Sequence, residues 1–151
     1  MTAPTRWRCA TWAELTVDEL YRILAVRQAV FVVEQTCPYQ DADGRDRDAV
    51  HLWAEADDGA ILAYARLFAP GARFAEACIG RVITAAAARG TGLGRALLAE
   101  AIARCAERWG PGPIRLGAQR YLERFYGGFG FVPDGEPYDE DGIPHVEMVR
   151  A

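Results

Sequence analysis

The sequence predicts a mixed α/β domain (α+β) in which a sheet with both parallel and antiparallel strands carries helices on its faces. Strand-like and helix-like segments alternate along the chain, and the helices differ in length. Two apolar runs around Asp58 and Gly59 indicate an antiparallel hairpin near the centre. A chain of 151 residues has room for one core. We therefore expect a single domain over residues 1–151, built on a mixed sheet.

The first predicted helix lies within residues 15–35. Thr16 and Glu19 have the spacing of a capping box, in which the side chain of each residue binds the backbone N–H of the other. Apolar residues follow at approximately helical spacing, and Pro38 should end the helix. Residues 37–49 contain acids and a glycine without apolar periodicity, so we expect a loop there.

The remaining elements follow in the same alternating order. A hairpin is expected within residues 51–71, and a second long helix should end at Gly110, with Pro111 just beyond it. The other expected elements are a strand at 77–84, that helix at 92–110, a strand at 113–118, a short helix within 119–130, and a closing pair of strands at 131–135 and 144–150.

The charge balance argues against a nucleic-acid partner. The net charge is −4 and the isoelectric point is about 5.2, whereas binding a phosphate backbone requires a basic face. All 17 basic residues are arginines, which excludes chemistry that needs a lysine, such as a Schiff base or a P-loop. No apolar run has the length of a signal peptide or a membrane-spanning helix, so we expect a cytoplasmic protein without a membrane partner.

Neither the cysteines nor the acidic residues form a metal-binding pattern. The four cysteines lie far apart without a CxxC pair, which favours buried reduced thiols. The acids within residues 40–48 suggest calcium, but the sixth position from Asp41 is Asp46 rather than glycine, and the twelfth is Leu52 rather than glutamate. We therefore expect no metal site.

Residues 89–94, RGTGLG, lie between a predicted strand and a predicted helix. Their glycines leave backbone N–H groups uncovered at a helix N-terminus, where the helix dipole adds positive charge. The loop is therefore either a phosphate cradle or a tight structural turn. A Rossmann loop beginning at Gly90 would need glycine or alanine where Arg95 stands, and a P-loop would need Gly-Lys-Ser/Thr. The spacing that remains is Arg-x-x-Gly-x-Gly, beginning at Arg89.

The segment RGTGLGRALL, which follows the strand IGRVIT, resembles the coenzyme A loop of the GNAT superfamily of N-acetyltransferases. The segment YLERFYGGFGF at 121–131 is similar to the late part of that family, where a short helix carries a tyrosine shortly before a Gly-Phe step. RQAVFVVEQTCPYQDADGRDRDAVHL, RLGAQRYLERFYGGFGF and DEDGIPHVEM further resemble the ElaA-type branch. The resemblance covers about residues 7–149.

This resemblance implies the GNAT fold, with a central sheet of six or seven strands that splays open after the strand at 77–84. It also implies acetyl-CoA as co-substrate, with the pantetheine arm inserted beside that strand. Arg95 either adds a phosphate contact or is an ordinary solvated arginine. The backbone of Val82, Ile83 and Thr84 would bind the pantetheine, and Arg89, Gly90, Thr91, Gly92, Leu93 and Gly94 would bind the pyrophosphate.

The resemblance also suggests catalytic roles. Acetyl transfer to an amine needs a neutral amine, stabilisation of the developing oxyanion and a proton for the departing thiolate. Tyr126 matches the family tyrosine and is the expected proton donor, while a backbone N–H near Val82 is the expected oxyanion donor. Glu34, His51 and His145 are candidates for the base, each with a purely structural alternative. No cysteine follows a nucleophile pattern, so we expect direct attack in a ternary complex.

The leading hypothesis is an acetyl-CoA-dependent N-acetyltransferase acting on a primary amine of a small molecule or a peptide. The acidic segments 40–48 and 134–142 either attract a cationic amine or are ordinary solvated loops. Two alternatives remain. One is a coenzyme A-binding sensor or interaction module without catalysis. The other is an acyltransferase similar to acyl-homoserine-lactone synthases, because the segment RQAVFVVEQ of this chain faintly resembles the first helix of those enzymes. Exposed sheet edges make a homodimer a further expectation.

Overall fold

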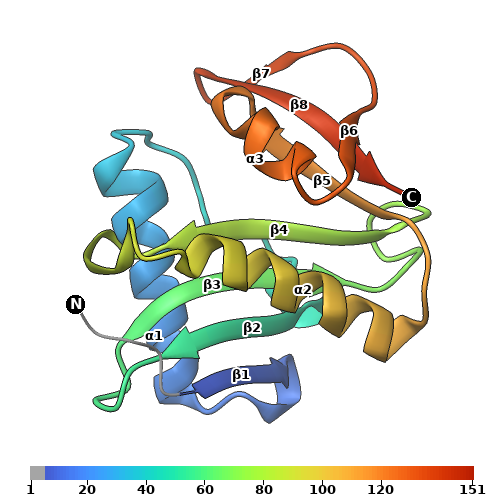
Figure 1. The fold of residues 1–151 in the computed structure, drawn as a ribbon. Helices are drawn as coiled ribbons and strands as arrows, with labels where there is room; N and C mark the ends of the chain where they lie inside the picture. Colours follow the sequence, from blue (N-terminus) through green and yellow to red (C-terminus); the bar gives the residue numbers. More distant parts are fainter. Residues whose placement is uncertain (1–5) are drawn as a thin grey trace.

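The computed structural model describes residues 6–151, and Figure 1 shows how their helices and strands are arranged around one sheet. The strands run in the order β1-β2-β3-β4-β5-β8-β6, with β7 paired to the free part of β8. The strands are β1 (Arg6–Thr11), β2 (Val50–Glu55), β3 (Ile61–Phe68), β4 (Ala77–Thr84), β5 (Ile114–Gln119), β6 (Phe131–Pro133), β7 (Tyr138–Glu140) and β8 (Ile143–Arg150). The helices are α1 (Val17–Arg27), which continues into a π-helical segment (Gln28–Glu34), α2 (Leu93–Trp109) and α3 (Glu123–Gly127).

The mixed sheet is confirmed, because β4 and β5 are parallel and the other strand pairs are antiparallel. The number of strands is a correction: residues 6–151 contain eight strands rather than six or seven. Both β6 and β7 pair with β8, and each has only three residues. All three residues of β7 are exposed, so this strand has no apolar pattern that a sequence argument could detect.

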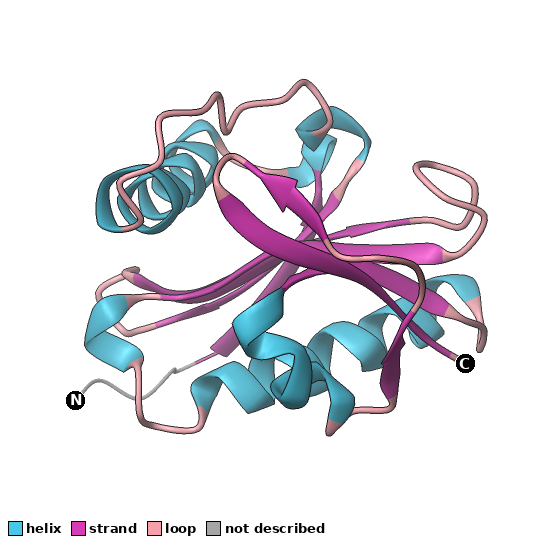
Figure 2. Ribbon diagram, turned by 90° about the horizontal axis from the view of Figure 1, so that it is seen from above, coloured by secondary structure: helices cyan, strands magenta, loops and turns pink. Residues whose placement is uncertain are grey.

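Helices cover both faces of the sheet, as Figure 2 shows. The helix α1 and the π-helical segment lie on one face, and α2 and α3 lie on the other. Consecutive residues of β2 therefore belong to different cores: Leu52 packs with α2, and Trp53 packs with α1. Because both faces are covered, every residue of β2 and β3 is buried.

The capping box of the first helix is confirmed. The Thr16 hydroxyl accepts from the Glu19 N–H at 3.0 Å, and the Glu19 carboxylate accepts from the Thr16 N–H at 2.9 Å. The helix is not α-helical throughout, because the α-helix changes to a π-helix at Gln28. Such segments are rare in proteins and are frequent at functional sites. This one ends at Glu34, which forms an ion pair with Arg89 of the glycine loop.

No helix within residues 6–151 is long and apolar enough to cross a membrane. In the same part of the chain, no three His, Cys, Asp or Glu side chains come together as a metal site would require.

Candidate active site

The strands β4 and β5 are paired only where they begin. Ala77 pairs with Ile114, Cys78 pairs with Arg115, and beyond these residues the strands diverge (Figure 1). We call the unpaired parts of the two strands, residues 79–84 and 116–119, the strand fork. The backbone N–H and C=O groups that β4 turns toward β5 have no ladder partner there, so they are available to a ligand.

A β-bulge lies within the strand fork. Tyr64 of β3 pairs with Ile83, and Arg66 pairs with Gly80, so the register shifts between the two pairs. Ala65 of β3 therefore lies opposite two residues of β4, Arg81 and Val82. Arg81 has a φ of +50°, a left-handed conformation that is unusual for a residue with a side chain.

The glycine loop connects β4 to α2. Gly90 and Gly92 have φ values of +78° and +84°, which a residue with a Cβ adopts only with strain. Gly92 is the N-cap of α2 and contributes no side-chain cap; the Leu93 N–H is bound by the Thr91 hydroxyl, and the N–H groups of Gly94 and Arg95 remain available. A Cβ added at Gly90 or Gly92 would meet nothing within 4 Å, which shows open space beside the loop. These features fit a pyrophosphate bound at the positive end of the helix dipole.

Gly94 has a different role from the two loop glycines. A Cβ at Gly94 would lie 3.3 Å from Oγ1 of Thr84, so this glycine allows α2 to pack closely against the end of β4. Thr91 fixes the preceding turn, because its hydroxyl donates to the Ala88 carbonyl at 2.6 Å and accepts from the Leu93 N–H at 3.3 Å. The hydroxyl of Thr91 is therefore used within the loop.

The two arginines of this segment contact protein groups. Nε of Arg89 donates to the Thr84 carbonyl at 3.1 Å, and the guanidinium forms an ion pair with Glu34 at 2.7 Å. Arg95 lies with its guanidinium carbon 5.5 Å from the ring centroid of Phe129. Besides the phosphate contact or solvated side chain expected from the sequence, Arg95 thus has a cation–π contact.

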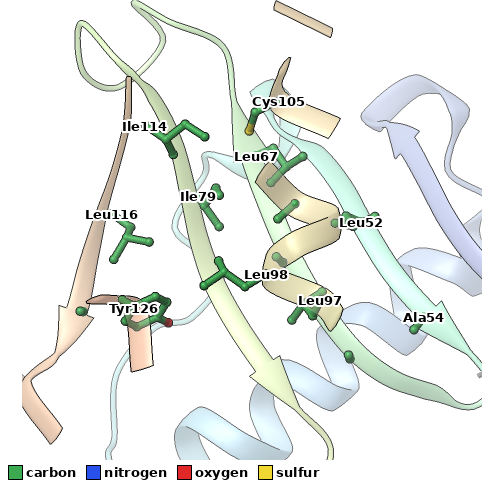
Figure 3. Close-up of a cluster of buried hydrophobic side chains, with 14 of the residues drawn as sticks. Leu52, Ala54, Leu67, Ile79, Leu97, Leu98, Cys105, Ile114, Leu116 and Tyr126 are labelled. Atoms are coloured by element: carbon green, nitrogen blue, oxygen red, sulfur yellow. The ribbon is translucent and has the colours of Figure 1, made fainter. Parts of the chain in front are cut away.

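Tyr126 lies in the core on the α2 and α3 side of the sheet. Its ring packs edge-on against Phe125 and Phe131, with centroid distances of 5.3 and 6.2 Å, and only 5% of the residue is exposed. Figure 3 shows the ring beside the strand fork, with its oxygen on the side of β4. Burial raises the pKa of the Tyr126 hydroxyl above its ordinary value of about 10, so the group is protonated at neutral pH with or without this shift. Among residues 6–151 the hydroxyl has no hydrogen-bond partner.

His145 lies on the opposite side of the sheet. It is the cross-strand neighbour of Gln119, so the two side chains share a face. Gln119 donates to the side-chain oxygen of Gln35 at 3.4 Å, so this face is turned toward the end of the first helix. Nδ1 of His145 lies 2.7 Å from the Ile143 carbonyl, and Nε2 lies 3.4 Å from the Glu140 carboxylate. The strand fork thus separates Tyr126 on one face from His145 on the other.

Glu34 lies at the end of the π-helical segment. Its side chain is 41% exposed, and its carboxylate is bound to Arg89. A general base needs an oxygen that is free to accept a proton from the substrate. The ion pair links the first helix to the glycine loop, and a catalytic role for Glu34 stays a prediction.

His51 is fully buried, with 0% of the residue exposed. Its Nδ1 lies 2.6 Å from the Tyr64 hydroxyl, and its Nε2 lies 3.0 Å from the Asp46 carbonyl. Both ring nitrogens are therefore engaged within the protein, and a substrate amine has no access to them. This placement favours the structural alternative for His51 over the role of base.

The burial of His51 predicts a pH-dependent stability. Burial lowers the pKa of His51, so below a pH of about 6.5 the unfolded chain binds a proton more readily than the folded chain does. We expect the free energy of unfolding to fall by about 1 kcal/mol from this group as the pH falls from about 7.5 to 5.5. Urea unfolding of the wild type and of His51→Gln at both pH values measures this change in the free energy of unfolding. Identical pH dependences of the two proteins would contradict the prediction.

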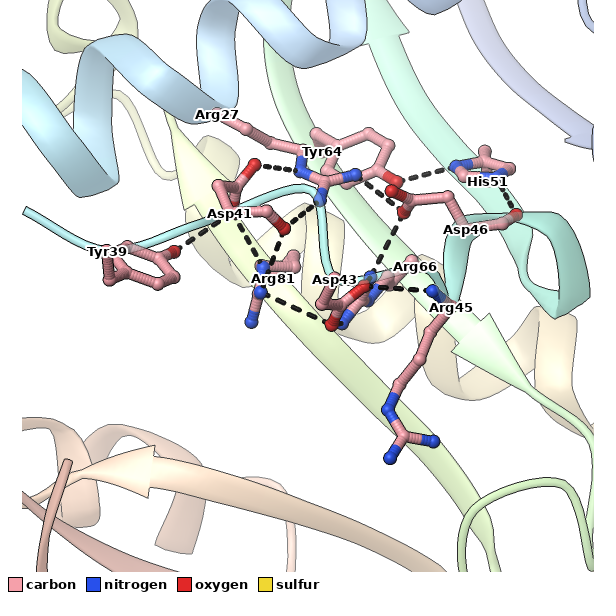
Figure 4. A network of polar contacts seen from close by, with 10 residues as sticks. All are labelled: Arg27, Tyr39, Asp41, Asp43, Arg45, Asp46, His51, Tyr64, Arg66 and Arg81. Atoms are coloured by element: carbon pink, nitrogen blue, oxygen red, sulfur yellow. Dashed lines mark hydrogen bonds and ion pairs between the residues drawn. The ribbon is translucent and has the colours of Figure 1, made fainter. Parts of the chain in front are cut away.

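The acidic loop is part of a buried cluster of charges, which Figure 4 shows. Arg27 of α1 is fully buried and donates to the carboxylates of Asp41 at 2.8 Å and Asp46 at 2.7 Å. Arg66 of β3 is also buried and donates to the same Asp46 oxygen at 3.0 Å. We call Arg27, Asp41, Asp43, Asp46, Arg66 and Arg81 the arginine–aspartate cluster.

Asp43 and Arg81 lie at the outer edge of this cluster. Burial opposes ionisation of Asp43, but hydrogen bonds from Arg66 and from the Arg45 N–H hold its pKa well below the usual range. Three of the four aspartates in residues 40–48 are thus paired with arginines. The sequence predicts a solvated or substrate-attracting loop here, whereas in the structure these three acids hold the loop against the sheet.

Sequence reasoning missed this cluster, although two signals for it exist. Arg27 shares a helix face with Ile23 and Val30, which are buried. Arg66 lies within the otherwise apolar strand ILAYARLF. A charged residue at a core position needs a partner of opposite charge, and the nearby acidic segment supplies it.

Comparisons with known proteins agree with this geometry. A family model described as "Acetyltransferase (GNAT) domain" matches residues 20–151. The chain is 44% identical over 146 residues to the protein ElaA of Escherichia coli, which covers 95% of each chain. The crystal structure of that ElaA protein matches with a TM-score of 0.90 at 42% identity, covering 97% of this chain and 99% of the other. An acyl-CoA N-acyltransferase from Pseudomonas aeruginosa matches with a TM-score of 0.91 at 46% identity and the same coverage.

Proposed function

The chain belongs to the GNAT acetyltransferase family and to its ElaA-type branch, and from this premise we propose that it transfers the acetyl group of acetyl-CoA to a primary amine of a small molecule or a peptide. The family implies an acyl-CoA co-substrate. The observation that carries the proposal is the strand fork, which opens directly beside the glycine loop at the start of α2. A thioester bound in the strand fork would have Tyr126 on one face of the sheet and His145 on the other.

The residues present fit the donor. The backbone of Val82, Ile83 and Thr84 lines the β4 side of the strand fork, and the first turn of α2 has free N–H groups at Gly94 and Arg95. Acetyl-CoA, when bound, supplies an acetyl group activated as a thioester. In the proposal the extended backbone of β4 binds the pantetheine amides, and the glycine loop binds the pyrophosphate.

Gly92→Asp tests the glycine loop. An aspartate at an N-cap accepts hydrogen bonds from the first N–H groups of a helix, and its charge repels phosphate. We expect the variant to fold but to lose the thermal stabilisation by acetyl-CoA, which in the wild type amounts to about 2.7 kcal/mol when the ligand is at 100 times its Kd. Differential scanning fluorimetry without and with acetyl-CoA measures both the folding of the variant and its stabilisation by the ligand.

Gly71→Asp is the matched control, since Gly71 also has a positive φ, of +88°, is exposed, and a Cβ there meets nothing within 4 Å, so the substitution introduces the same backbone strain and the same charge away from the loop. This variant should keep the full stabilisation. Equal stabilisation of both variants by acetyl-CoA would refute the placement of the pyrophosphate.

Three groups of this chain meet the needs of the transfer. In the proposal the Tyr126 hydroxyl, which is protonated at neutral pH, donates its proton to the departing sulfur. The Val82 N–H stabilises the negative charge that develops on the acetyl oxygen. His145 is the base in this proposal: Nδ1–H donates to the Ile143 carbonyl, and Nε2, which faces the exposed Glu140 carboxylate at 3.4 Å, accepts the proton of the amine. The amine then attacks the thioester carbon directly, in a ternary complex.

A panel of amines tests the reaction. The wild-type protein is incubated with acetyl-CoA and each amine, and the release of free coenzyme A is followed with a thiol reagent. We expect at least one primary amine to accelerate the release. If acetyl-CoA stabilises the protein while no amine accelerates release, the sensor or interaction module becomes the better account.

The nature of the acceptor is a further part of the proposal. Three of the four aspartates in residues 40–48 are paired to arginines, whereas the end of β7 and the turn after it carry the exposed acids Glu140 and Asp141. This turn lies next to His145, so it would attract a cationic amine. A polyamine should therefore react faster than an acidic amino acid, and equal rates would remove this part of the proposal. We also propose that the protein is cytoplasmic. We further propose that it forms a homodimer, and analytical ultracentrifugation tests this by measuring its molecular mass in solution.

A further inference from the structure

One side chain anchors the β-bulge of β4. The guanidinium of Arg81 reaches the loop that follows the first helix, where Nε donates to Oδ1 of Asp41 at 2.8 Å and Nη2 donates to the Asp41 carbonyl at 3.2 Å. A single arginine thus binds both a side-chain atom and a main-chain atom of one loop residue. The residue that makes these bonds is also the residue with the left-handed φ of +50°.

The other end of this anchor is rigid. Asp41 is only 5% exposed, and its second carboxylate oxygen accepts from the fully buried Arg27 at 2.8 Å. Its first oxygen also accepts from the Tyr39 hydroxyl at 2.9 Å. Figure 4 shows the resulting chain of contacts from α1 through Asp41 to Arg81 on β4. The bulge is therefore tied to the first helix through buried groups.

The neighbouring strands do not fix the bulge by themselves. On one side the ladder with β3 is interrupted opposite Ala65, and on the other the ladder with β5 has already ended at Cys78. Arg81 and Val82 thus lie where β4 has its weakest backbone support. A non-glycine residue in the left-handed region persists only where its surroundings hold it.

We propose that Arg81 is a positioning residue: its bonds to Asp41 hold residue 81 in the left-handed conformation and thereby fix the Val82 N–H at the strand fork. The consequence for turnover rests on the proposed function, because Val82 stabilises an oxyanion only if the protein transfers an acyl group. Arg81 itself contacts no reacting atom. Its loss should therefore lower kcat by a larger factor than it raises the KM for acetyl-CoA.

Two substitutions at residue 81 separate the backbone effect from the loss of the ion pair. Arg81→Ala and Arg81→Gly remove the same guanidinium, but glycine enters the left-handed region without strain and alanine does not. We expect kcat of Arg81→Ala to fall about 30-fold or more, and kcat of Arg81→Gly to stay about tenfold above it. Arg45→Ala is the control, because the Arg45 side chain extends away from the cluster (Figure 4) and its removal should leave kcat unchanged.

Arg81→Lys provides a variant that keeps the charge of the arginine–aspartate cluster. Lysine lacks the planar fork that reaches a carboxylate and a carbonyl together, so its kcat should fall about 3- to 10-fold. Equal kcat values for the alanine and glycine variants, or wild-type kcat for the lysine variant, would overturn the proposal. Failure of the wild type on every amine would instead refute the proposed function.

A crystal structure of Arg81→Ala gives a readout that does not depend on turnover. We expect residue 81 to leave the left-handed region and the bulge to shift, while Arg81→Gly keeps a positive φ. An alanine that keeps φ near +50° with an unchanged bulge would show that Arg81 does not hold this conformation. Should the alanine variant not fold, the lysine variant is crystallised in its place, and an unchanged bulge there has the same meaning.

Discussion

Tyr126→Phe is expected to lower kcat about 100-fold while acetyl-CoA still binds, because general acid catalysis contributes at least that much. The substitution removes one oxygen and keeps the ring, which packs against Phe125 and Phe131. Since the hydroxyl has no hydrogen-bond partner within residues 6–151, its loss should hardly change the free energy of unfolding. Steady-state kinetics and thermal unfolding with and without acetyl-CoA measure these effects.

Tyr121→Phe is the matched control. Tyr121 precedes α3 and is 76% exposed, so the loss of its hydroxyl should leave kcat unchanged. Wild-type kcat in Tyr126→Phe would remove Tyr126 as the proton donor. Equal losses in both variants would point to a general effect on this segment.

Asp46→Ala is expected to lower the free energy of unfolding by about 3–5 kcal/mol, the usual cost of removing one partner from a buried ion pair. One oxygen of Asp46 accepts from both Arg27 and Arg66, at 2.7 and 3.0 Å. Each of these arginines keeps one aspartate partner, but each loses part of the compensation for its buried charge. Urea unfolding at pH 7 measures the loss.

Asp48→Ala controls for the change of loop sequence, because Asp48 lies two residues further along and is exposed. It should change the free energy of unfolding by less than about 0.5 kcal/mol. A loss of similar size in both variants would show that the loop, rather than the ion pairs of Asp46, determines the effect.

Most of the fold could be predicted from the sequence because its local signals agree with its tertiary packing. Thr16 and Glu19 form the predicted capping box, and α2 ends before Gly110 as its apolar face and C-cap predict. The hairpin around Gly59 has the expected antiparallel pairing. In each case a local rule and the burial of an apolar face favour the same structure.

The parts that sequence reasoning missed depend on contacts between distant residues. The π-helical segment at Gln28–Glu34 has no distinct local pattern, and β7 is an exposed strand of three residues held by β8. The role of Asp41 depends on Arg27 and Arg81, which come from two other elements. Only the folded chain shows that these acids hold the loop to β4.

The central claim, direct transfer of acetyl to an amine, is tested most directly by mass spectrometry of a complete reaction mixture. The wild-type protein is incubated with acetyl-CoA and a mixed panel of amines, and the products, the free coenzyme A and the intact protein are quantified together. The account predicts an N-acetylated amine in a one-to-one ratio with released coenzyme A, and protein of unchanged mass. Release of coenzyme A without an acetylated amine, or an acetylated protein that passes its acetyl group on, would contradict it.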